Sequence, residues 1–144
     1  MIRIIVAGSR DFNDFGLVDK TLTKYMTNMS LTKDDIEIVS GCARGADRLG
    51  EQFATKHNLV CAKFPAEWDR YGKSAGYRRN AQMADYAIQE TGVLFAFWDG
   101  SSKGTKHMID LATTKGMNVN VVNYKIPEPV NEAEIDVSDD RQYS

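Results

Sequence analysis

Residues 2–12 read Ile-Arg-Ile-Ile-Val-Ala-Gly-Ser-Arg-Asp-Phe, an apolar run that ends in a glycine turn. A short run that is rich in β-branched residues and closed by glycine predicts a strand that is buried on both faces, here over Ile2–Ala7. Four later segments of the 144-residue chain have the same character: Ile36–Ser40, Leu59–Phe64, Val93–Trp98 and Val119–Asn123.

Longer amphipathic stretches separate these runs. Between the first two strands, apolar residues recur at helical spacing from Leu17 to Met29, and Asn13 is the expected N-cap. Similar patterns follow the second, third and fourth strands. Alternating strands and helices predict an α/β fold, a Rossmann-like open parallel sheet of about five strands with helices on both faces. No repeat or linker interrupts residues 1–125, which are expected to form one domain.

The net charge of −2 hides an uneven distribution. Residues 126–144 contain six acidic residues and one basic residue, which leaves 17 basic and 14 acidic residues in 1–125, a body of about +3. We expect the last 19 residues to form a flexible acidic tail. The chain has no signal-peptide pattern and no run long enough to span a membrane, so the expected location is the cytoplasm.

The loops that follow the first four strands are unusually rich in glycine and basic residues. They are Gly8–Phe12, Gly41–Asp47, Pro65–Asn80 and Asp99–Thr105, and they hold seven of the eleven glycines. Seven of the 17 basic residues in the body also lie there: Arg10, Arg44, Arg70, Lys73, Arg78, Arg79 and Lys103. In a parallel sheet these loops meet at the carboxyl edge, where ligands bind. Glycine lets the backbone approach a ligand, and helix N-termini and arginine forks attract anions.

For any single loop, turn glycines and a solvated charged rim are an equally good explanation, but four such loops at one edge favour an anion site. Pro65–Asn80 is expected to be a long loop without regular structure. Its aromatic residues Trp68, Tyr71 and Tyr77 either pack the loop onto the body or stack on a base, and we expect one of them to contact ligand. Familiar motifs are absent or out of context. The first turn lacks GxGxxG, and Gly72-Lys73-Ser74-Ala75-Gly76 fits neither a complete Walker A loop nor a nucleophile elbow after a strand.

Four motifs in order resemble one family. They are Gly8-Ser9-Arg10-Asp11-Phe12, Ser40-Gly41-Cys42-Ala43-Arg44-Gly45-Ala46-Asp47, Gly72–Gly76 with Arg78-Arg79-Asn80, and Asp99-Gly100-Ser101-Ser102-Lys103-Gly104-Thr105. Over residues 1–123 the chain resembles the YspA, or cpYpsA-related, branch of the SLOG superfamily. That resemblance implies a Rossmann-like fold and a site for nucleotides or their derivatives. Relatives include the LOG phosphoribohydrolases and the DNA-processing protein DprA.

The resemblance also implies roles for individual residues. Gly8, Ser9 and Arg10 would line one wall of the site, and Gly41, Ala43, Gly45 and Asp47 a second. Arg78 and Asn80 would reach in from a third side, and Ser102, Gly104 and Thr105 would hold phosphate. From their loops alone, Arg44, Trp68, Lys73 and Lys103 are further candidates for ligand binding.

The chain departs from the LOG enzymes at one catalytic position. Their GGxGTxxE motif supplies a glutamate, and Met108 stands at that spacing here. A thioether can neither act as a base nor stabilise a cationic centre, so hydrolysis by the LOG route is not expected. Asp47, Glu67, Asp69 and Asp99 are candidate replacements, and the sequence selects none of them.

Three functions compete. The preferred one is binding of a nucleotide or nucleotide-derived phosphate ligand, for sensing or sequestration; the alternative is release of a base by cleavage of an N-glycosidic bond. DprA-like binding of single-stranded DNA is less favoured, because the body carries only about +3 and phosphate tracking needs many cations.

No cofactor is predicted, although Mg²⁺ accompanying a phosphate ligand is left open. The expected partner is a small molecule rather than nucleic acid or membrane, and a homo-oligomer that completes the site is an open alternative.

Overall fold

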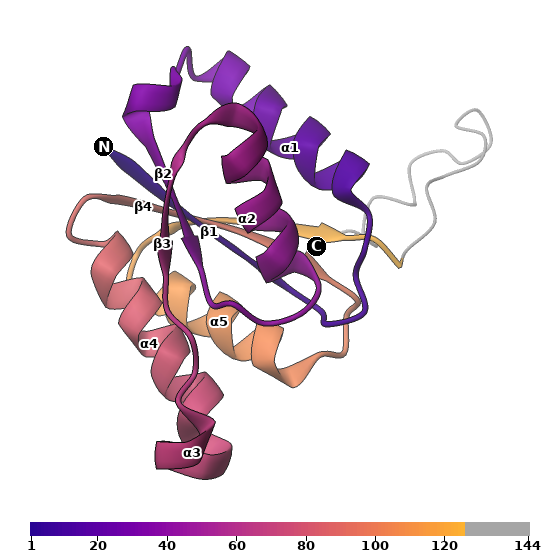
Figure 1. Ribbon diagram of the computed structural model, residues 1–144, viewed down its shortest axis with the longest axis vertical. Helices are drawn as coiled ribbons and strands as arrows, with labels where there is room; N and C mark the ends of the chain where they lie inside the picture. The colour runs from indigo at the N-terminus through magenta and orange to yellow at the C-terminus, as the bar shows by residue number, and fades with distance from the viewer. Residues whose placement is uncertain (126–144) are drawn as a thin grey trace.

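The computed structural model describes residues 1–125 as a five-stranded parallel sheet with helices on both faces (Figure 1). The strands are β1 (Ile2–Gly8), β2 (Ile36–Ser40), β3 (Val60–Lys63), β4 (Thr91–Trp98) and β5 (Asn118–Asn123). The helices are α1 (Phe15–Asn28), α2 (Ala46–His57), the single turn α3 (Trp68–Tyr71), α4 (Ala75–Ala87) and α5 (Lys103–Thr114). The predicted fold class is confirmed. The predicted acidic tail lies outside the described residues.

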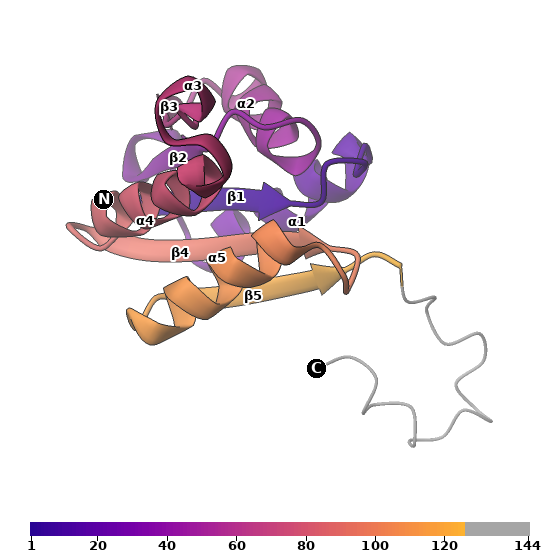
Figure 2. The ribbon, with the colours of Figure 1, turned by 90° about the horizontal axis from the view of Figure 1, so that it is seen from below.

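The central strands are apolar at successive positions because each face of the sheet is covered by a different pair of helices. On β1, Ile4 and Val6 face the core under α1 and α2, whereas Ile5 and Ala7 face the core under α4 and α5. Figure 2 shows α4 and α5 together on one side of the sheet, opposite α1 and α2. Alternate residues of one strand therefore stabilise two separate hydrophobic cores.

The strand order β3-β2-β1-β4-β5 places the reversal of the winding beside β1. The chain builds outward from β1 through β2 to β3, and then returns to add β4 on the other side of β1. The loops after β1 and β4 consequently leave the same edge and diverge to opposite faces. In α/β sheets this reversal is where a ligand crevice forms.

The exits of β1, β2 and β4 are packed against one another at two glycines. A β-carbon on Gly8 would lie 2.3 Å from the carbonyl oxygen of Phe97 and 2.7 Å from the β-carbon of Ala46. Gly45 has a φ of +82°, and a β-carbon there would lie 2.2 Å from the carbonyl oxygen of Ser9. Both positions therefore require glycine to bring the three exits into contact.

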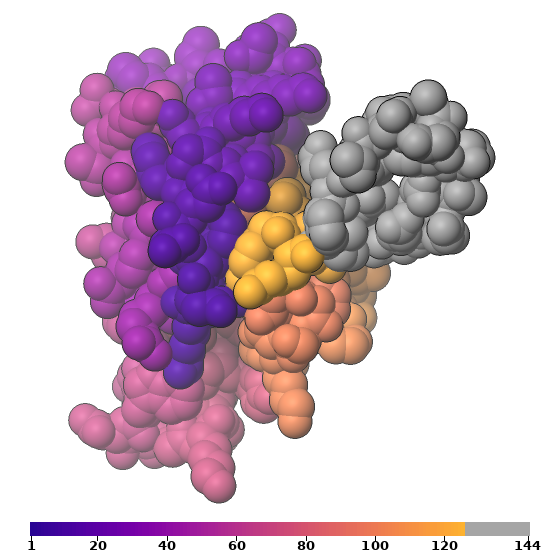
Figure 3. Space-filling model, turned by 90° about the vertical axis from the view of Figure 1, so that its right-hand side faces the viewer, coloured from indigo at the N-terminus to yellow at the C-terminus, as the bar shows by residue number. Residues whose placement is uncertain are grey.

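The last described residues pack beside the first loop. The rings of Phe12 and Tyr124 are 4.5 Å apart, and the Tyr124 hydroxyl donates to Asp11 at 3.1 Å. Figure 3 shows this side of the molecule, with the segment after β1 (indigo) against the end of β5 (yellow). No helix within residues 1–125 is long and apolar enough to cross a membrane.

Two local predictions were wrong. Helix α1 is capped by Asp14, whose carboxylate accepts from the Leu17 amide at 3.0 Å, rather than by Asn13. Pro65–Asn80 is not an irregular loop, because it contains α3, a 3₁₀ turn at Gly72–Ser74 and the first six residues of α4. The glycines and basic residues of this segment had suggested a loop, yet Ala75, Asn80, Met83 and Ala84 bury one face of α4 against the sheet.

We expect Gly8→Ala to destabilise the protein by about 1–3 kcal/mol, because the new methyl group overlaps main chain on β4 and the start of α2. Gly104→Ala is the matched control, since a β-carbon there meets no heavy atom within 4 Å and alanine favours helix. Urea unfolding of both variants measures the difference. Equal stability of Gly8→Ala and the unmodified protein would contradict the proposed close packing.

Candidate functional site

A cavity of about 490 Å³ lies at the winding reversal, at the carboxyl ends of β1 and β4. The last two residues of β1 and the three that follow it, Ala7 to Asp11, form one wall, and α4 and the beginning of α5 form the opposite one. The other lining residues are Ala43, Asp47, Trp68, Lys73, Gly76, Tyr77, Arg79, Asn80, Met83, Asp99, Ser102, Gly104, Thr105 and Met108. Four elements distant in sequence thus meet around one space.

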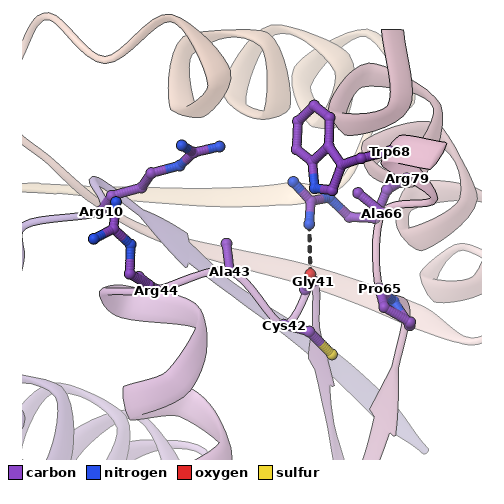
Figure 4. A pocket seen from close by; sticks show the side chains of 9 residues that line it. All are labelled: Arg10, Gly41, Cys42, Ala43, Arg44, Pro65, Ala66, Trp68 and Arg79. Carbon is purple, nitrogen blue, oxygen red and sulfur yellow. Dashed lines mark hydrogen bonds between the residues drawn. The ribbon is translucent and has the colours of Figure 1, made fainter. Parts of the chain in front are cut away.

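A second cavity of about 560 Å³ adjoins the first on the side of β2 and β3. Arg10, Ala43, Trp68 and Arg79 line both cavities, so they form a common wall. Figure 4 shows this second cavity, with Arg10 and Arg44 on one side and Arg79 and Trp68 on the other. We call the two together the joined cavities.

The loop after β2 is folded around the carboxylate of Asp47, the second residue of α2. Asp47 is 5% exposed, and its Oδ2 accepts from the Ala43 amide at 3.3 Å. A β-carbon on Gly41 would lie 2.7 Å from that same oxygen and 2.7 Å from Nη1 of Arg79. The glycine at position 41 therefore allows the loop, the acid and the arginine to come together.

Burial raises the pKa of Asp47 to about 6, although Arg79 and the Ala43 amide both favour the ionised form. Asp99 behaves in the opposite way. The amides of Ser101 and Ser102 each donate to its Oδ1 at 2.8 Å, and these bonds hold its pKa below the usual value. Of the three carboxyls that line the cavity, those of Asp11, Asp47 and Asp99, burial therefore raises the pKa of Asp47 and backbone amides lower the pKa of Asp99.

The N-terminus of α5 belongs to the wall opposite the β1 exit. Ser102 caps the helix, accepting from the Thr105 amide at 3.4 Å, and its hydroxyl lies 3.1 Å from the Thr105 hydroxyl. The space beside Gly104 is open, with no heavy atom within 4 Å of the position of a β-carbon. The free amides and the positive end of a helix dipole make such a position suited to an anion.

Arg79 occupies the common wall of the joined cavities. Its Nη1 donates to the Gly41 carbonyl, and its Nε donates to Oδ1 of Asn80 at 3.1 Å. Partial burial lowers the pKa of Arg79, although a guanidinium stays charged at any physiological pH. Within residues 1–125, Arg10, Arg44, Lys73 and Arg79 form no ion pair with a carboxylate. The joined cavities therefore hold four cations whose charge no ion pair with a described carboxylate balances.

Most residues predicted from the sequence lie at the joined cavities. These are Gly8, Ser9, Arg10, Gly41, Ala43, Arg44, Asp47, Trp68, Lys73, Asn80, Asp99, Ser102, Gly104 and Thr105. Gly45 and Lys103 are not among the lining residues, and neither are the candidate acids Glu67 and Asp69. Glu67 instead lies 3.7 Å from Arg70 on the exposed turn α3.

Arg78 is not among the lining residues of either cavity. Its Nε donates to the Ser74 hydroxyl at 3.0 Å, and its guanidinium lies 4.3 Å from the centre of the Tyr71 ring. Its neighbour Arg79 takes the cavity position, because Gly76, Arg79, Asn80 and Met83 share one stripe of α4. Adjacent residues of an α-helix point about 100° apart, so a helix prediction for this segment would have placed only one of the two arginines on the cavity side.

Of the aromatic candidates, Tyr77 lines the cavity together with Trp68, whereas Tyr71 lines neither cavity. Tyr77 is 47% exposed and its ring lies 4.5 Å from that of His107. Two further lining residues, Met83 and Met108, were not predicted to bind ligand, and they form an apolar floor. No three His, Cys, Asp or Glu side chains within the described part of the chain gather closely enough to hold a metal ion.

Comparison with known proteins places these features in context. The family model described as "YspA, cpYpsA-related SLOG family" matches residues 2–71, which span β1 through α3. The chain is also similar to the "Gene 61 protein" of Mycobacterium phage D29, with 30% identity over 124 residues, covering 83% of this chain and 94% of the phage protein. No solved structure matches.

The raised pKa of Asp47 predicts a specific dependence of stability on pH. The folded state holds the proton more tightly than the unfolded chain, so this group stabilises the fold at pH 4 and loses that contribution as the pH rises through about 6. The loss amounts to about 3 kcal/mol. We expect Asp47→Asn to lack this loss, so that its free energy of unfolding falls less between pH 4 and pH 7 than that of the unmodified protein. Urea unfolding at the two pH values measures the difference.

Asp69→Asn serves as the control for this measurement, because Asp69 is exposed and lies outside the joined cavities. It should leave the pH dependence as it is in the unmodified protein. If Asp47→Asn also left it unchanged, the carboxyl of Asp47 would be ionised at ordinary pH and the assigned effect of burial would be wrong.

Proposed function

This chain belongs to the YspA, cpYpsA-related SLOG family, and from that premise we propose that it binds a nucleotide or nucleotide-derived phosphate ligand in the joined cavities. The observation that carries the proposal is Arg79. Its half-buried guanidinium forms no ion pair within residues 1–125, although the carboxyl of Asp47 lies beside it, and it lines both cavities, which points to a bound anion.

The phosphate is assigned to the N-terminus of α5. The open space beside Gly104, together with the hydroxyls of Ser102 and Thr105, offers amide and hydroxyl donors at the positive end of the helix. Lys73 lines the same cavity and adds positive charge. The ionised Asp99 is already occupied by two amides, which limits its repulsion of an incoming anion.

The nucleoside is assigned to the side of the cavity with aromatic and thioether groups. Trp68 is 49% exposed and Tyr77 47% exposed, so each presents a ring at the mouth of the cavity. Met83 and Met108 supply the apolar floor below them. Aromatic faces that stay exposed in a cavity suit a planar base, which would cover them on binding.

A second function, release of the base, is supported by the contrast between Asp47 and Asp99. The carboxyl of Asp47 is available as an acid near pH 6, and Asp99 remains a carboxylate. In this alternative Asp47 gives its proton to the departing base nitrogen as the C1′–N bond breaks. Water forms the new C1′–O bond and gives a proton to the Asp99 carboxylate.

Incubation of the full chain with AMP, CMP, NAD and ADP-ribose, followed by mass spectrometry, separates the two functions. Under the binding proposal the compounds are recovered intact and at least one raises the melting temperature. Free base or nicotinamide, produced by the unmodified protein and lost in Asp47→Asn, would instead favour the enzyme.

Paired arginine variants test the location of the site. Arg79→Ala should weaken binding of the best compound from that panel by about tenfold or more, because charge-assisted hydrogen bonds contribute roughly 1.5–3 kcal/mol. Arg78→Ala should bind as the unmodified protein does, since Arg78 contacts Ser74 and Tyr71 instead. Isothermal titration calorimetry measures both affinities.

Gly104→Ala completes the set, because its methyl group would occupy the space assigned to phosphate without disturbing the fold. It should also weaken binding. Loss of affinity in Arg78→Ala but not in Arg79→Ala would place the ligand outside the joined cavities.

A further inference from the structure

The side chain of Asn80 contacts three residues of the site, Arg79, Gly104 and His107. It is 6% exposed, and its Nδ2 donates to the Gly104 carbonyl at 3.3 Å and lies 3.0 Å from Nδ1 of His107. Its Oδ1 accepts from Nε of Arg79 at 3.1 Å. One amide thus connects the arginine of the common wall with the first turns of α5.

The donors and acceptors around Asn80 allow a single orientation of its amide. If the amide were turned over, Nδ2 would face the Nε–H of Arg79, donor against donor. Its oxygen would then face the Gly104 carbonyl, acceptor against acceptor. In the orientation that remains, the amide N–H points at Nδ1 of His107, which must therefore carry a lone pair. His107 is neutral in this arrangement, with its proton on Nε2.

We propose that Asn80 is a positioning residue, aligned by the Gly104 carbonyl and neutral His107, that holds the Arg79 guanidinium ready for an anion, and that protonation of His107 releases it. The predicted effect on anion binding rests on the proposed function, whereas the contacts among Asn80, Arg79 and His107 do not. When Nδ1 of His107 gains a proton it opposes the amide N–H, so Asn80 must rotate and Arg79 loses its acceptor at Nε.

The groups around His107 are consistent with this arrangement. The ring of Tyr77 packs on it from α4 with 4.5 Å between centroids, and burial lowers the pKa of His107 while Asp110 on its own helix opposes that effect. The positive end of α5 also disfavours a second charge near it. Arg79 is faced in turn by Asp47, whose pKa is about 6, and by the cation Arg10.

The expected pH dependence of anion binding therefore has two components of opposite sign. Protonation of Asp47 removes a negative charge beside Arg79 and strengthens anion binding as the pH falls. Protonation of His107 withdraws the support of Arg79 and weakens binding, although simple electrostatics would predict that an added positive charge strengthens it. The sign of the His107 component distinguishes a positioning role from a merely electrostatic one.

The first test needs no ligand. Nuclear magnetic resonance of the full chain follows the Arg79 Nε–H signal and the His107 ring signals between pH 8 and pH 4.5, with Asp47→Asn as background to remove the other titration. We expect the Arg79 signal to shift with the midpoint of His107, and His107→Phe, which keeps a ring on Tyr77, to abolish that shift. An Arg79 signal that does not respond while His107 titrates would overturn the proposal.

Asn80→Asp provides a second check on the contact between residue 80 and the His107 ring. A carboxylate at position 80 accepts from protonated Nδ1, so the pKa of His107 should rise by at least about one unit above its value in the unmodified protein. An unchanged His107 pKa would show that residue 80 does not contact the ring and would overturn the proposal.

The second test measures affinity for inorganic sulfate, whose charge does not change in this range. In the Asp47→Asn background we expect affinity to fall several-fold from pH 7.5 to pH 5, and in Asp47→Asn/His107→Phe to stay level. Stronger binding at low pH in the first variant would contradict the positioning role. If neither sulfate nor any compound of the nucleotide panel binds while the Arg79 signal still follows His107, the proposed function is wrong and the positioning of Arg79 by Asn80 stands.

Discussion

The main chain at the end of β1 passes so close to β4 and α2 that position 8 has no room for a β-carbon. Gly45 brings the loop after β2 against Ser9 in the same way. Additional bonds join the exits, because the Ser9 amide donates to the Phe97 carbonyl at 3.1 Å and the Ser9 hydroxyl accepts from the Asp99 amide at 3.2 Å. The three exits thus form one packed unit that holds the walls of the joined cavities.

This packed unit has an electrostatic consequence. It buries Asp47 behind the loop that it organises and holds Asp99 against two amides, so both acids are engaged with backbone. The cations that line the joined cavities, Arg10, Arg44, Lys73 and Arg79, form no ion pair in residues 1–125. A crevice with engaged acids and unpaired cations attracts anions, even though the whole chain carries a net charge of −2.

Helix α4 connects the fold with the site more closely than the sequence indicated. Its apolar face packs under the sheet through Met83 and Ala84, and the next turn toward its N-terminus presents Arg79 and Asn80 to the cavity. Asn80 in turn contacts the Gly104 carbonyl on α5. The packing of α4 against α5 therefore sets the distance between the arginine and the helix N-terminus that we assign to phosphate.

The strands could be predicted from the sequence because each is a short apolar run with a clear end; Ile36–Ser40 is reproduced without change, and β4 begins only two residues early, at Thr91. The concentration of glycine and arginine at one sheet edge was likewise visible, since parallel strands must place their exits together. The order of the strands in the sheet could not be predicted from the sequence. Val60 of β3 is 64% exposed because β3 lies at an edge, a position that its apolar sequence did not reveal.

The sequence by itself determined the fold class and the edge where functional residues gather, because both depend on local periodicity and on turn residues. Only the tertiary structure decided which side chains enter the cavity. Arg78 and Arg79 are chemically identical neighbours, and a rotation of about 100° along α4 sends one to solvent and the other to the common wall. The same holds for the four candidate acids, since burial and backbone contacts, which depend on distant segments, separate Asp47 and Asp99 from Glu67 and Asp69.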